Sequence, residues 1–381
     1  MAELNETPSS GRTRIAFFGL RNAGKSTLAN AFTGQPVSIV SEVAGTTTDP
    51  VSKAMEILPL GPCLVTDTAG LDDVGELGAE RVRRTLAVLA ETDVAVWVET
   101  PGDGASAARS AFERECAARA VPVLVHRRGD TAESLRARVA ALRPAEAAPG
   151  LLDGLVGPGG RVICVCPIDA AAPKGRLILP QVQLLRDALD RHATCVVCQV
   201  AELPAALERE TSGGGGDSFA MPLVVTDSQA FGEVARAADR HPGKFRLTSF
   251  SVLFARQKGD LAAFLKGLDA IGRLKDGDRV LVAEGCTHHR QCGDIGTVKV
   301  PKALAKLSGR RLEFVFASGG DFPLVREGRP FALVVHCGGC MLTRRAVLSR
   351  LAIAREAGVP VVNYGMLLAA AAGVDVSRLA T

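Results

Sequence analysis

The sequence predicts an α/β protein in which an N-terminal, doubly wound, mainly parallel sheet is followed by two smaller α/β domains. Three observations predict this. Short β-rich runs alternate with helical patterns over residues 14–142, which is typical of a parallel sheet covered by helices on both faces. A glycine-rich phosphate-binding motif lies between the first β-rich run and the first helical pattern. Two further sets of such runs follow a Pro- and Gly-rich stretch at 144–160, in a chain of 381 residues that exceeds one ordinary core.

Each set has its own expected elements. The first has strands at Ile15–Gly19, Cys63–Asp67, Val94–Val98 and Val121–Val125. The second has strands at Arg161–Pro167, Cys195–Val200 and Pro222–Thr226, and helices at Gln181–Arg191 and Gln229–Arg240. The third begins near Phe250, with strands at Arg279–Glu284, Leu312–Ala317, Phe331–Val335 and Val359–Val362, and helices at Lys302–Leu307 and Thr343–Ala357. We therefore expect three domains, at 12–157, 158–250 and 251–381.

The composition is that of a folded protein, with nearly half of the residues apolar and about a quarter charged. A formal charge of +4, without a run of basic residues, gives no reason to expect nucleic-acid or anionic-membrane binding. The polar N-terminus and the lack of a long apolar run predict a cytoplasmic protein. Ten cysteines in such a protein indicate reduced thiols or metal ligands in preference to disulfides.

The phosphate-binding motif is Gly19-Leu20-Arg21-Asn22-Ala23-Gly24-Lys25-Ser26, which fits the P-loop pattern in full. Its glycines let main-chain amides surround phosphate groups at a helix N-terminus. We expect Lys25 to bridge the β- and γ-phosphates and Ser26 to ligate Mg²⁺. The expected nucleotide-binding residues here are Gly19, Asn22, Ala23, Gly24, Lys25, Ser26 and Thr27.

A second motif, Asp67-Thr68-Ala69-Gly70, follows a predicted strand. Asp67 supplies a carboxylate at the strand end for the Mg²⁺ shell, and the Gly70 amide can sense the γ-phosphate. Together with the P-loop, this motif indicates an NTPase that switches between two states.

Both motifs resemble those of TrmE/Era-like GTPases. That resemblance implies that Thr47, within Gly45-Thr46-Thr47-Thr48-Asp49, completes the Mg²⁺ coordination. We expect Lys25, Thr47, Asp67 and Gly70 to serve hydrolysis. The resemblance also implies that Asn22 accompanies a K⁺ ion. Leu71 stands where Ras-like enzymes carry a water-orienting glutamine, so slow hydrolysis is expected.

The base-reading motif departs from the pattern of this class. Arg127-Arg128-Gly129-Asp130 stands where Asn-Lys-x-Asp is expected, so only Asp130 could read the guanine edge. Losing one member of a buried donor–acceptor set weakens the discrimination of guanine from other bases. The preference for GTP over ATP therefore rests largely on the resemblance.

Cysteines and histidines gather in two segments, Cys286-Thr287-His288 and His336-Cys337-Gly338-Gly339-Cys340. Each follows a predicted strand, and the carboxyl ends of strands in an open α/β sheet face one crevice. Three thiolates suit either zinc or an iron–sulfur cluster, and small core residues are the third reading. Spacing alone does not choose among these. His288 and His336 are expected either to ligate the metal or to hydrogen-bond beside it.

The C-terminal motifs give a closer resemblance, to the HydF family of [FeFe]-hydrogenase maturation GTPases. It covers nearly the whole chain and rests on the GTPase motifs, Cys286-Thr287-His288-His289, His336-Cys337-Gly338-Gly339-Cys340-Met341, the stretch 167–176 and Val225-Thr226-Asp227-Ser228-Gln229. It implies a central dimerisation domain, a homodimer, and a [4Fe–4S] cluster on Cys286, Cys337 and Cys340. It further implies a scaffold that receives a di-iron precursor from two radical-SAM maturases and passes it to apo-[FeFe]-hydrogenase.

Two other functions remain open at this point. One is a TrmE/Era-type GTPase of RNA or ribosome maturation with a structural zinc domain, which predicts a basic surface. The other is a redox enzyme that uses the cluster for electron transfer, which predicts a fully Cys-ligated cluster and a substrate pocket.

Overall fold

The computed structural model describes residues 11–34, 51–58, 60–72, 76–101, 106–142, 149–168, 177–211, 221–227, 230–285, 294–319, 322–324 and 329–379. The chain divides into two compact units, residues 1–147 and 148–381. Every expected strand and helix is present, with ends shifted by a few residues. No helix in these ranges is long and apolar enough to cross a membrane.

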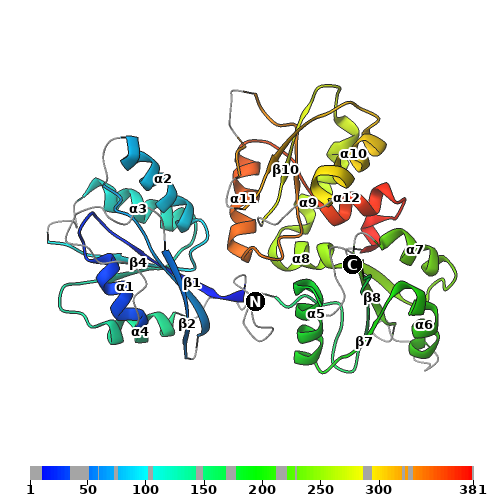
Figure 1. Cartoon of the computed structure of the whole chain (residues 1–381), viewed down its shortest axis with the longest axis horizontal. Coiled ribbons are helices and arrows are strands. Elements are labelled where there is room, and N and C mark those ends of the chain that lie inside the picture. Colours follow the sequence, from blue (N-terminus) through cyan, green and yellow to red (C-terminus); the bar gives the residue numbers. More distant parts are fainter. Residues whose placement is uncertain are drawn as a thin grey trace. The chain divides into compact units, whose positions relative to one another are not determined.

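The first unit contains a five-stranded sheet in the order β2-β3-β1-β4-β5, in which β2 alone runs antiparallel. Its strands are β1 (Thr13–Phe18), β2 (Val51–Ile57), β3 (Gly61–Asp67), β4 (Val94–Val98) and β5 (Val123–His126). Its helices are α1 (Lys25–Thr33), α2 (Glu76–Leu89), α3 (Ala107–Ala118) and α4 (Ala132–Ala141). Helices α1 and α4 lie on one face of the sheet, and α2 and α3 on the other (Figure 1).

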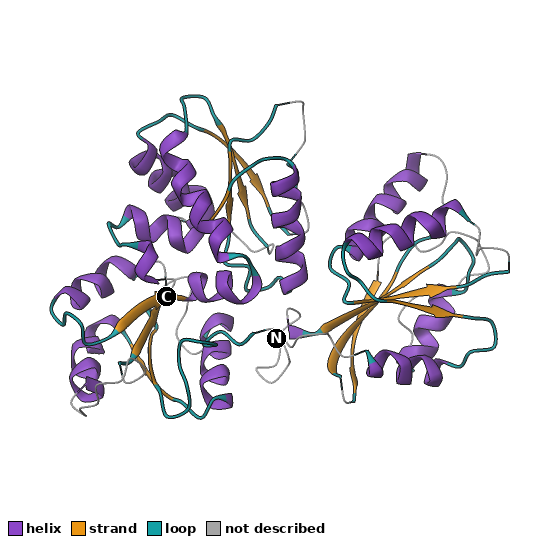
Figure 2. Ribbon diagram, turned by 180° about the vertical axis from the view of Figure 1, so that it is seen from behind, coloured by secondary structure: helices purple, strands orange, loops and turns teal. Residues whose placement is uncertain are grey.

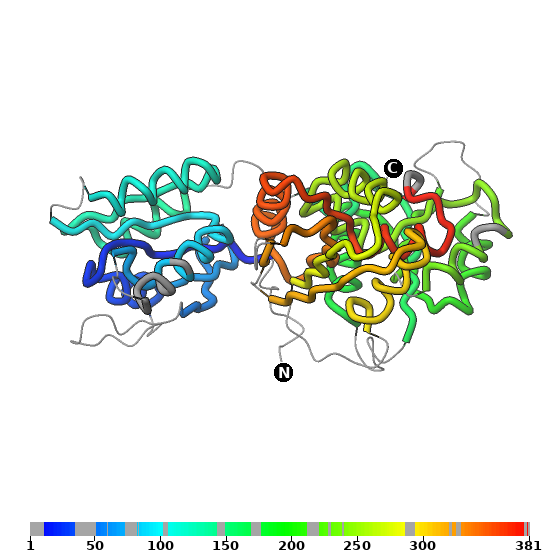
Figure 3. The backbone as a smooth tube through the Cα atoms, turned by 90° about the horizontal axis from the view of Figure 1, so that it is seen from above, coloured from blue at the N-terminus to red at the C-terminus, as the bar shows by residue number. Residues whose placement is uncertain are grey.

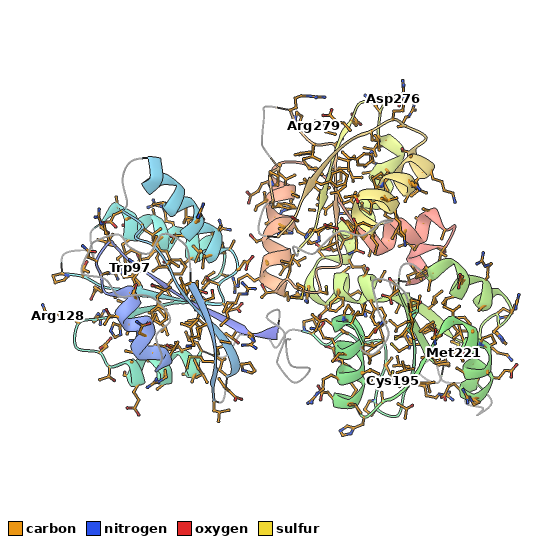
Figure 4. All side chains as sticks on the ribbon, viewed as in Figure 1. Trp97, Arg128, Cys195, Met221, Asp276 and Arg279 are labelled. Carbon is orange, nitrogen blue, oxygen red and sulfur yellow. The ribbon has the colours of Figure 1, made fainter. Side chains whose placement is uncertain are left out.

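Helices on both faces explain why β1 and β4 are apolar without alternation. Phe17 of β1 packs edge-to-face on Phe32 of α1, with ring centroids 5.4 Å apart. Trp97 of β4 packs on Phe112 of α3 at 5.0 Å on the opposite face. Figure 4 shows Trp97 inside this unit, with Arg128 at its edge. The two cores hold the sheet and thereby the loops at its carboxyl edge.

The second unit contains two four-stranded sheets in which every neighbouring pair is parallel. The central sheet, in the order β7-β6-β8-β9, has β6 (Arg161–Val165), β7 (Thr194–Cys198), β8 (Leu223–Thr226) and β9 (Arg246–Ser249). The C-terminal sheet, in the order β11-β10-β12-β13, has β10 (Arg279–Ala283), β11 (Glu313–Ala317), β12 (Leu333–His336) and β13 (Val361–Asn363). Their helices are α5 (Leu179–Asp190), α6 (Leu203–Thr211), α7 (Phe231–Asp239), α8 (Phe250–Lys258), α9 (Leu261–Ala270), α10 (Val300–Ser308), α11 (Arg344–Glu356) and α12 (Tyr364–Ala371). Figure 2 shows helices packed around both sheets.

Helix α8 contributes side chains to the cores of both of these sheets. Its Phe250, Leu253 and Phe254 lie in the core of the central sheet. Its Val252 and Ala255 lie in the core of the C-terminal sheet. The helix is therefore shared, although the sequence pattern suggested that a new domain simply begins there.

The end of the described chain also returns to the central sheet. The 3-10 turn Val376–Leu379 lies beside β9, where Thr248 Oγ1 donates a hydrogen bond to the Leu379 carbonyl at 3.0 Å. Figure 3 shows this red segment next to the green part of the chain. The two sheets of the second unit are thus tied together at α8 and again near β9.

Candidate functional site

The P-loop connects β1 to α1 at the carboxyl edge of the first sheet. Gly24 (φ 86°) and Asn22 (φ 60°) have left-handed backbone conformations, which turn the loop back toward the helix. A Cβ at Gly19 would lie 2.8 Å from the Val98 carbonyl oxygen, so only glycine fits there. Among the other predicted ligands, Ala23 is half-buried and Thr27 is exposed on α1.

Lys25 is buried, with only 7% of its surface exposed, at the first position of α1. Its Nζ donates to the Leu20 carbonyl at 2.7 Å and to the Gly19 carbonyl at 3.4 Å. The ammonium group is therefore held inside the loop, where amides at a helix N-terminus favour a bound anion.

Ser26 and Asp67 meet beside this loop because β3 lies parallel to β1. The Ser26 Oγ donates to Asp67 Oδ2 at 2.6 Å, and Asp67 is fully buried. The other carboxylate oxygen, Oδ1, has no hydrogen-bond partner among the described residues. A buried carboxylate with one such oxygen, next to a hydroxyl, fits the oxygen ligation that Mg²⁺ prefers.

Gly70 packs directly on the P-loop. A Cβ at this position would lie 2.9 Å from the Arg21 amide nitrogen. The segment around it is held by Thr68, whose Oγ1 donates to the Phe17 carbonyl at 2.7 Å, and by the Leu71 amide, which donates to the Gly19 carbonyl at 3.2 Å. The Asp67–Gly70 segment and the P-loop thus form one contiguous site. Thr47 lies outside the described residues.

Asp130 follows β5 at the same edge of the sheet. Its Oδ2 accepts a hydrogen bond from the Arg127 amide at 2.9 Å, and this bond is the main reason why its pKa lies below the usual range. The carboxylate therefore closes the turn from Arg127 to Asp130 and is ionised at neutral pH.

The second predicted site lies at the carboxyl edge of the C-terminal sheet, where β10 and β12 are neighbours. The Cys337 amide donates to the Ala283 carbonyl at 3.0 Å, and the Gly285 amide lies 3.1 Å from Cys337 Sγ. Gly285 directly precedes Cys286 in the sequence. Cys286 and His288 themselves lie outside the described residues.

The loop from Cys337 to Leu342 connects β12 to α11 and carries two of the predicted thiol ligands. Gly339 has a left-handed conformation (φ 67°), and a Cβ at Gly338 would lie 3.3 Å from Ser251 Oγ. Cys340 packs against the core of the central sheet. Burial raises the pKa of both thiols, although amides of Gly285 and Gly339 act in the opposite direction on Cys337.

His336 is buried at the end of β12, and both of its ring nitrogens have partners. Nδ1 lies 2.7 Å from the Cys337 carbonyl, and Nε2 lies 3.4 Å from Arg350 Nη1. Since a guanidinium group can only donate, Nε2 accepts and Nδ1–H donates. Burial, with a further contribution from Arg350, lowers the pKa of this imidazole to about 4. Of the two roles predicted for His336, this geometry fits hydrogen bonding beside the ligands.

Lys258, which the sequence analysis did not single out, ends helix α8 under the same loop. It is 6% exposed, and its Nζ donates to the carbonyls of Gly339 (3.0 Å), Cys340 (3.0 Å) and Leu342 (2.8 Å). Burial lowers its pKa to about 8, while the nearby thiols of Cys340 and Cys337 act to raise it. No local sequence signal marks this lysine.

Within the described ranges, no group of three or more His, Cys, Asp and Glu is arranged to hold a metal ion. The surroundings of Cys337 nevertheless fit a cluster ligand. Amide N–H groups directed at a sulfur, glycines that let the main chain approach closely, and a buried cation are features that stabilise thiolate-bound iron.

Comparisons with known proteins divide the chain into three parts. Residues 14–126 match the model of a 50S ribosome-binding GTPase domain. Residues 151–259 match the hydrogen maturase F dimerization domain, and residues 262–379 match the hydrogen maturase F tetramerization domain.

Similar curated proteins match a short part of the chain. The tRNA modification GTPase MnmE of Methylobacterium sp. (strain 4-46) is 38% identical over 118 residues, which are 29% of this chain and 27% of that protein. GTPase Der of Wolinella succinogenes is 42% identical over 99 residues, which are 25% of this chain and 20% of that protein. The chain thus spans about a quarter or less of the length of these relatives.

Solved structures of Era are also similar. An Aquifex aeolicus Era variant bound to GDP and aluminium fluoride is 18% identical, with 80% of this chain and 92% of that chain covered and a TM-score of 0.27. Era in complex with MgGDPNP and part of 16S ribosomal RNA is 16% identical, with 81% and 93% covered and a TM-score of 0.28.

The fold and the phosphate site define a P-loop GTPase domain joined to two further α/β sheets. The two hydrogen maturase F models together match more than half of the chain. The chain belongs to the hydrogen maturase F (HydF) family of GTPases.

Proposed function

We propose that this chain is a GTP-hydrolysing scaffold that carries a [4Fe–4S] cluster and serves the maturation of [FeFe]-hydrogenase. It would receive the di-iron precursor of the hydrogenase cluster from two radical-SAM maturases and deliver it to apo-hydrogenase. The observation that carries this proposal is the contact between Cys337 and Gly285, the residue that directly precedes Cys286, in a chain of the hydrogen maturase F family.

The phosphate site supports nucleotide hydrolysis. Lys25 would hold the β- and γ-phosphates, and Ser26 and Asp67 would hold Mg²⁺, with Thr47 completing its coordination. The Gly70 amide would contact the γ-phosphate, because Gly70 already packs against Arg21 of the P-loop. Asp130 would read the guanine base and Asn22 would accompany K⁺. Hydrolysis would be slow, since Leu71 has no group that orients water.

The cluster would be held by Cys286, Cys337 and Cys340. When bound, an iron–sulfur cluster with three thiolate ligands supplies one exchangeable iron position. The chain's own residues support the site. The amides of Gly285 and Gly339 interact with the Cys337 thiol, His336 binds the Cys337 carbonyl, and Arg350 holds the His336 ring. His288 would be the histidine able to reach the open position.

The chain would act as a homodimer or a larger assembly of identical subunits. This follows from the matches to a dimerization domain at 151–259 and to a tetramerization domain at 262–379. We propose domains at 12–157, 158–250 and 251–381. Hydrolysis in the first domain would change the conformation of its switch segments and so control docking of the maturases and the hydrogenase. It would not drive oxidation or reduction of the cluster.

Reconstitution without oxygen tests the cluster directly. The chain incubated with ferrous iron and sulfide should turn brown and contain iron and sulfide in equal amounts. Cys286→Ser should lose the colour, whereas Cys198→Ser, a change in the central sheet, should keep it. A colourless, air-stable chain that contains zinc would overturn this proposal and favour a TrmE/Era-type GTPase with a structural zinc domain.

A further inference from the structure

The loop between Cys337 and Leu342 rests on helix α8, whose last residue is Lys258. Three main-chain carbonyls of this loop converge on the single ammonium group within 3.0 Å. The loop is anchored at both sides of this contact as well. Gly338 packs on Ser251 of the same helix, and the Arg344 side chain donates to the Gln257 carbonyl.

An ammonium group with almost no contact with water is costly unless its charge is balanced. All three of the hydrogen-bond acceptors found for Lys258 in the described chain are neutral carbonyls, and none is a carboxylate. The group also lies 4.9 Å from the centre of the Phe254 ring, a weaker cation–π contact. The carbonyl dipoles stabilise the positive charge of Lys258, but they do not neutralise it.

The groups that could cancel it are the thiols of the loop itself. A protonated thiol is neutral, whereas a thiol that binds iron is a thiolate. Cys340 carries one of the carbonyls that Lys258 holds, and Cys337 begins the loop. Ligation therefore places negative charge near a cation that has no charged partner in the described chain.

We propose that Lys258 is a positioning residue of the cluster site, which anchors the Cys337–Leu342 loop and offsets the negative charge of the ligated thiolates. This inference rests on the proposed cluster at these cysteines. It has a consequence for redox behaviour, because a fixed positive charge near a cluster stabilises its reduced, more negative state and raises its reduction potential.

Helix α8 also gives the anchor a wider role. Its apolar side chains belong to the cores of both the central and the C-terminal sheets. The ligand loop is therefore held by an element that neither sheet positions alone, and the cluster site depends on the two sheets staying packed.

Two variants of the full chain separate anchoring from charge. Lys258→Gln keeps N–H donors but removes the charge, and Lys258→Met removes both. Lys266→Gln, on the exposed side of α9, removes one charge from the helix that follows α8 and is the matched control. Circular dichroism should confirm that each variant is folded, and if Lys258→Met is not, Lys258→Gln decides.

In the cluster-loaded chain, a redox titration followed by electron paramagnetic resonance should give a more negative reduction potential for Lys258→Gln than for the unchanged chain and Lys266→Gln. In the metal-free chain, alkylation of Cys340, read by mass spectrometry, should be about tenfold faster in Lys258→Met than in Lys258→Gln. Both variants lack the charge that lowers the pKa of the Cys340 thiol, but only Lys258→Met also lacks an N–H donor for the loop carbonyls.

The charge role would be overturned if the fully loaded Lys258→Gln chain had the same reduction potential as the chain that carries Lys258. The anchoring role would be overturned if Cys340 were alkylated at equal rates in Lys258→Met and Lys258→Gln. If the unchanged chain binds no cluster, the proposed function fails and the charge role fails with it. The alkylation measurement then still decides whether Lys258 anchors the loop.

Discussion

The main-chain amide of Gly285 lies 3.1 Å from the sulfur of Cys337, across two neighbouring parallel strands and 52 residues of sequence. The contact exists because β10 pairs with β12 in a register that puts Ala283 opposite His336. The segment that leads to Cys286 is thereby joined to the Cys-x-x-Cys loop. The convergence of Cys286 itself with Cys337 and Cys340 stays a prediction, because Cys286 lies outside the described residues.

Replacing Lys25 by alanine should stop GTP hydrolysis and leave the cluster in place. The buried ammonium is the group that lies inside the phosphate loop, so its loss should reduce the hydrolysis rate by about 100-fold or more. Phosphate release and the iron content are the two measurements. Lys53→Ala, on edge strand β2, should hydrolyse GTP normally. Loss of iron from Lys25→Ala would contradict independent sites.

Replacing Gly70 by alanine should impair hydrolysis more than nucleotide binding. The new Cβ would lie 2.9 Å from the Arg21 amide nitrogen and 3.0 Å from its Cα, so the P-loop or the Asp67–Gly70 segment must move. A displaced γ-phosphate contact should lower the hydrolysis rate by about 10- to 100-fold. Single-turnover kinetics would measure it. Gly272→Ala, where a Cβ meets nothing within 4 Å, is the control.

Hydrolysis should be faster in potassium than in sodium at equal ionic strength. The expected K⁺ site depends on Asn22, whose left-handed backbone (φ 60°) aspartate and asparagine tolerate better than other side chains. Asn22→Ala should remove the difference between the two salts. A basal rate that is fast in both salts would contradict this prediction and the role of Leu71.

The preference for GTP over ATP should be weak and should depend on Asp130. Arg127 occupies the place of the asparagine in the base-reading motif, which leaves one carboxylate to recognise guanine. Competition binding should show that Asp130→Ala lowers the GTP/ATP preference about tenfold. Glu133→Ala, exposed at the start of α4, should not. Equal effects on both nucleotides would mean that Asp130 only closes its turn.

His336 should support the cluster site without ligating iron. His336→Ala leaves Arg350 without one acceptor and the Cys337 carbonyl without a donor. The free energy of unfolding should therefore fall by about 1–3 kcal/mol. Iron and sulfide per chain, measured after reconstitution, should stay the same, and His336→Gln should recover part of the stability. Complete loss of iron in both variants would assign His336 to the metal.

The strands and helices could largely be predicted, because buried parallel strands such as Val94–Val98 leave an apolar run that needs no tertiary information. Strand β2 could not. It is an exposed edge strand, Val51–Ile57, whose pairing with β3 depends on a partner and leaves little apolar signal. The same holds for α8, a short helix with a polar end whose two apolar faces serve different cores.

The sequence by itself determined the phosphate site, since the P-loop and the Asp67–Gly70 segment are contiguous motifs whose chemistry lies in adjacent residues. It also predicted the three cysteines of a second site, because three thiols after two strands form a pattern that can be read along the chain. Only the tertiary structure decided that both nitrogens of His336 are occupied and that Lys258 lies under Cys340, 82 residues away. Buried hydrogen bonds across such separations depend on which strands and helices pack together, and no local pattern of residues records that.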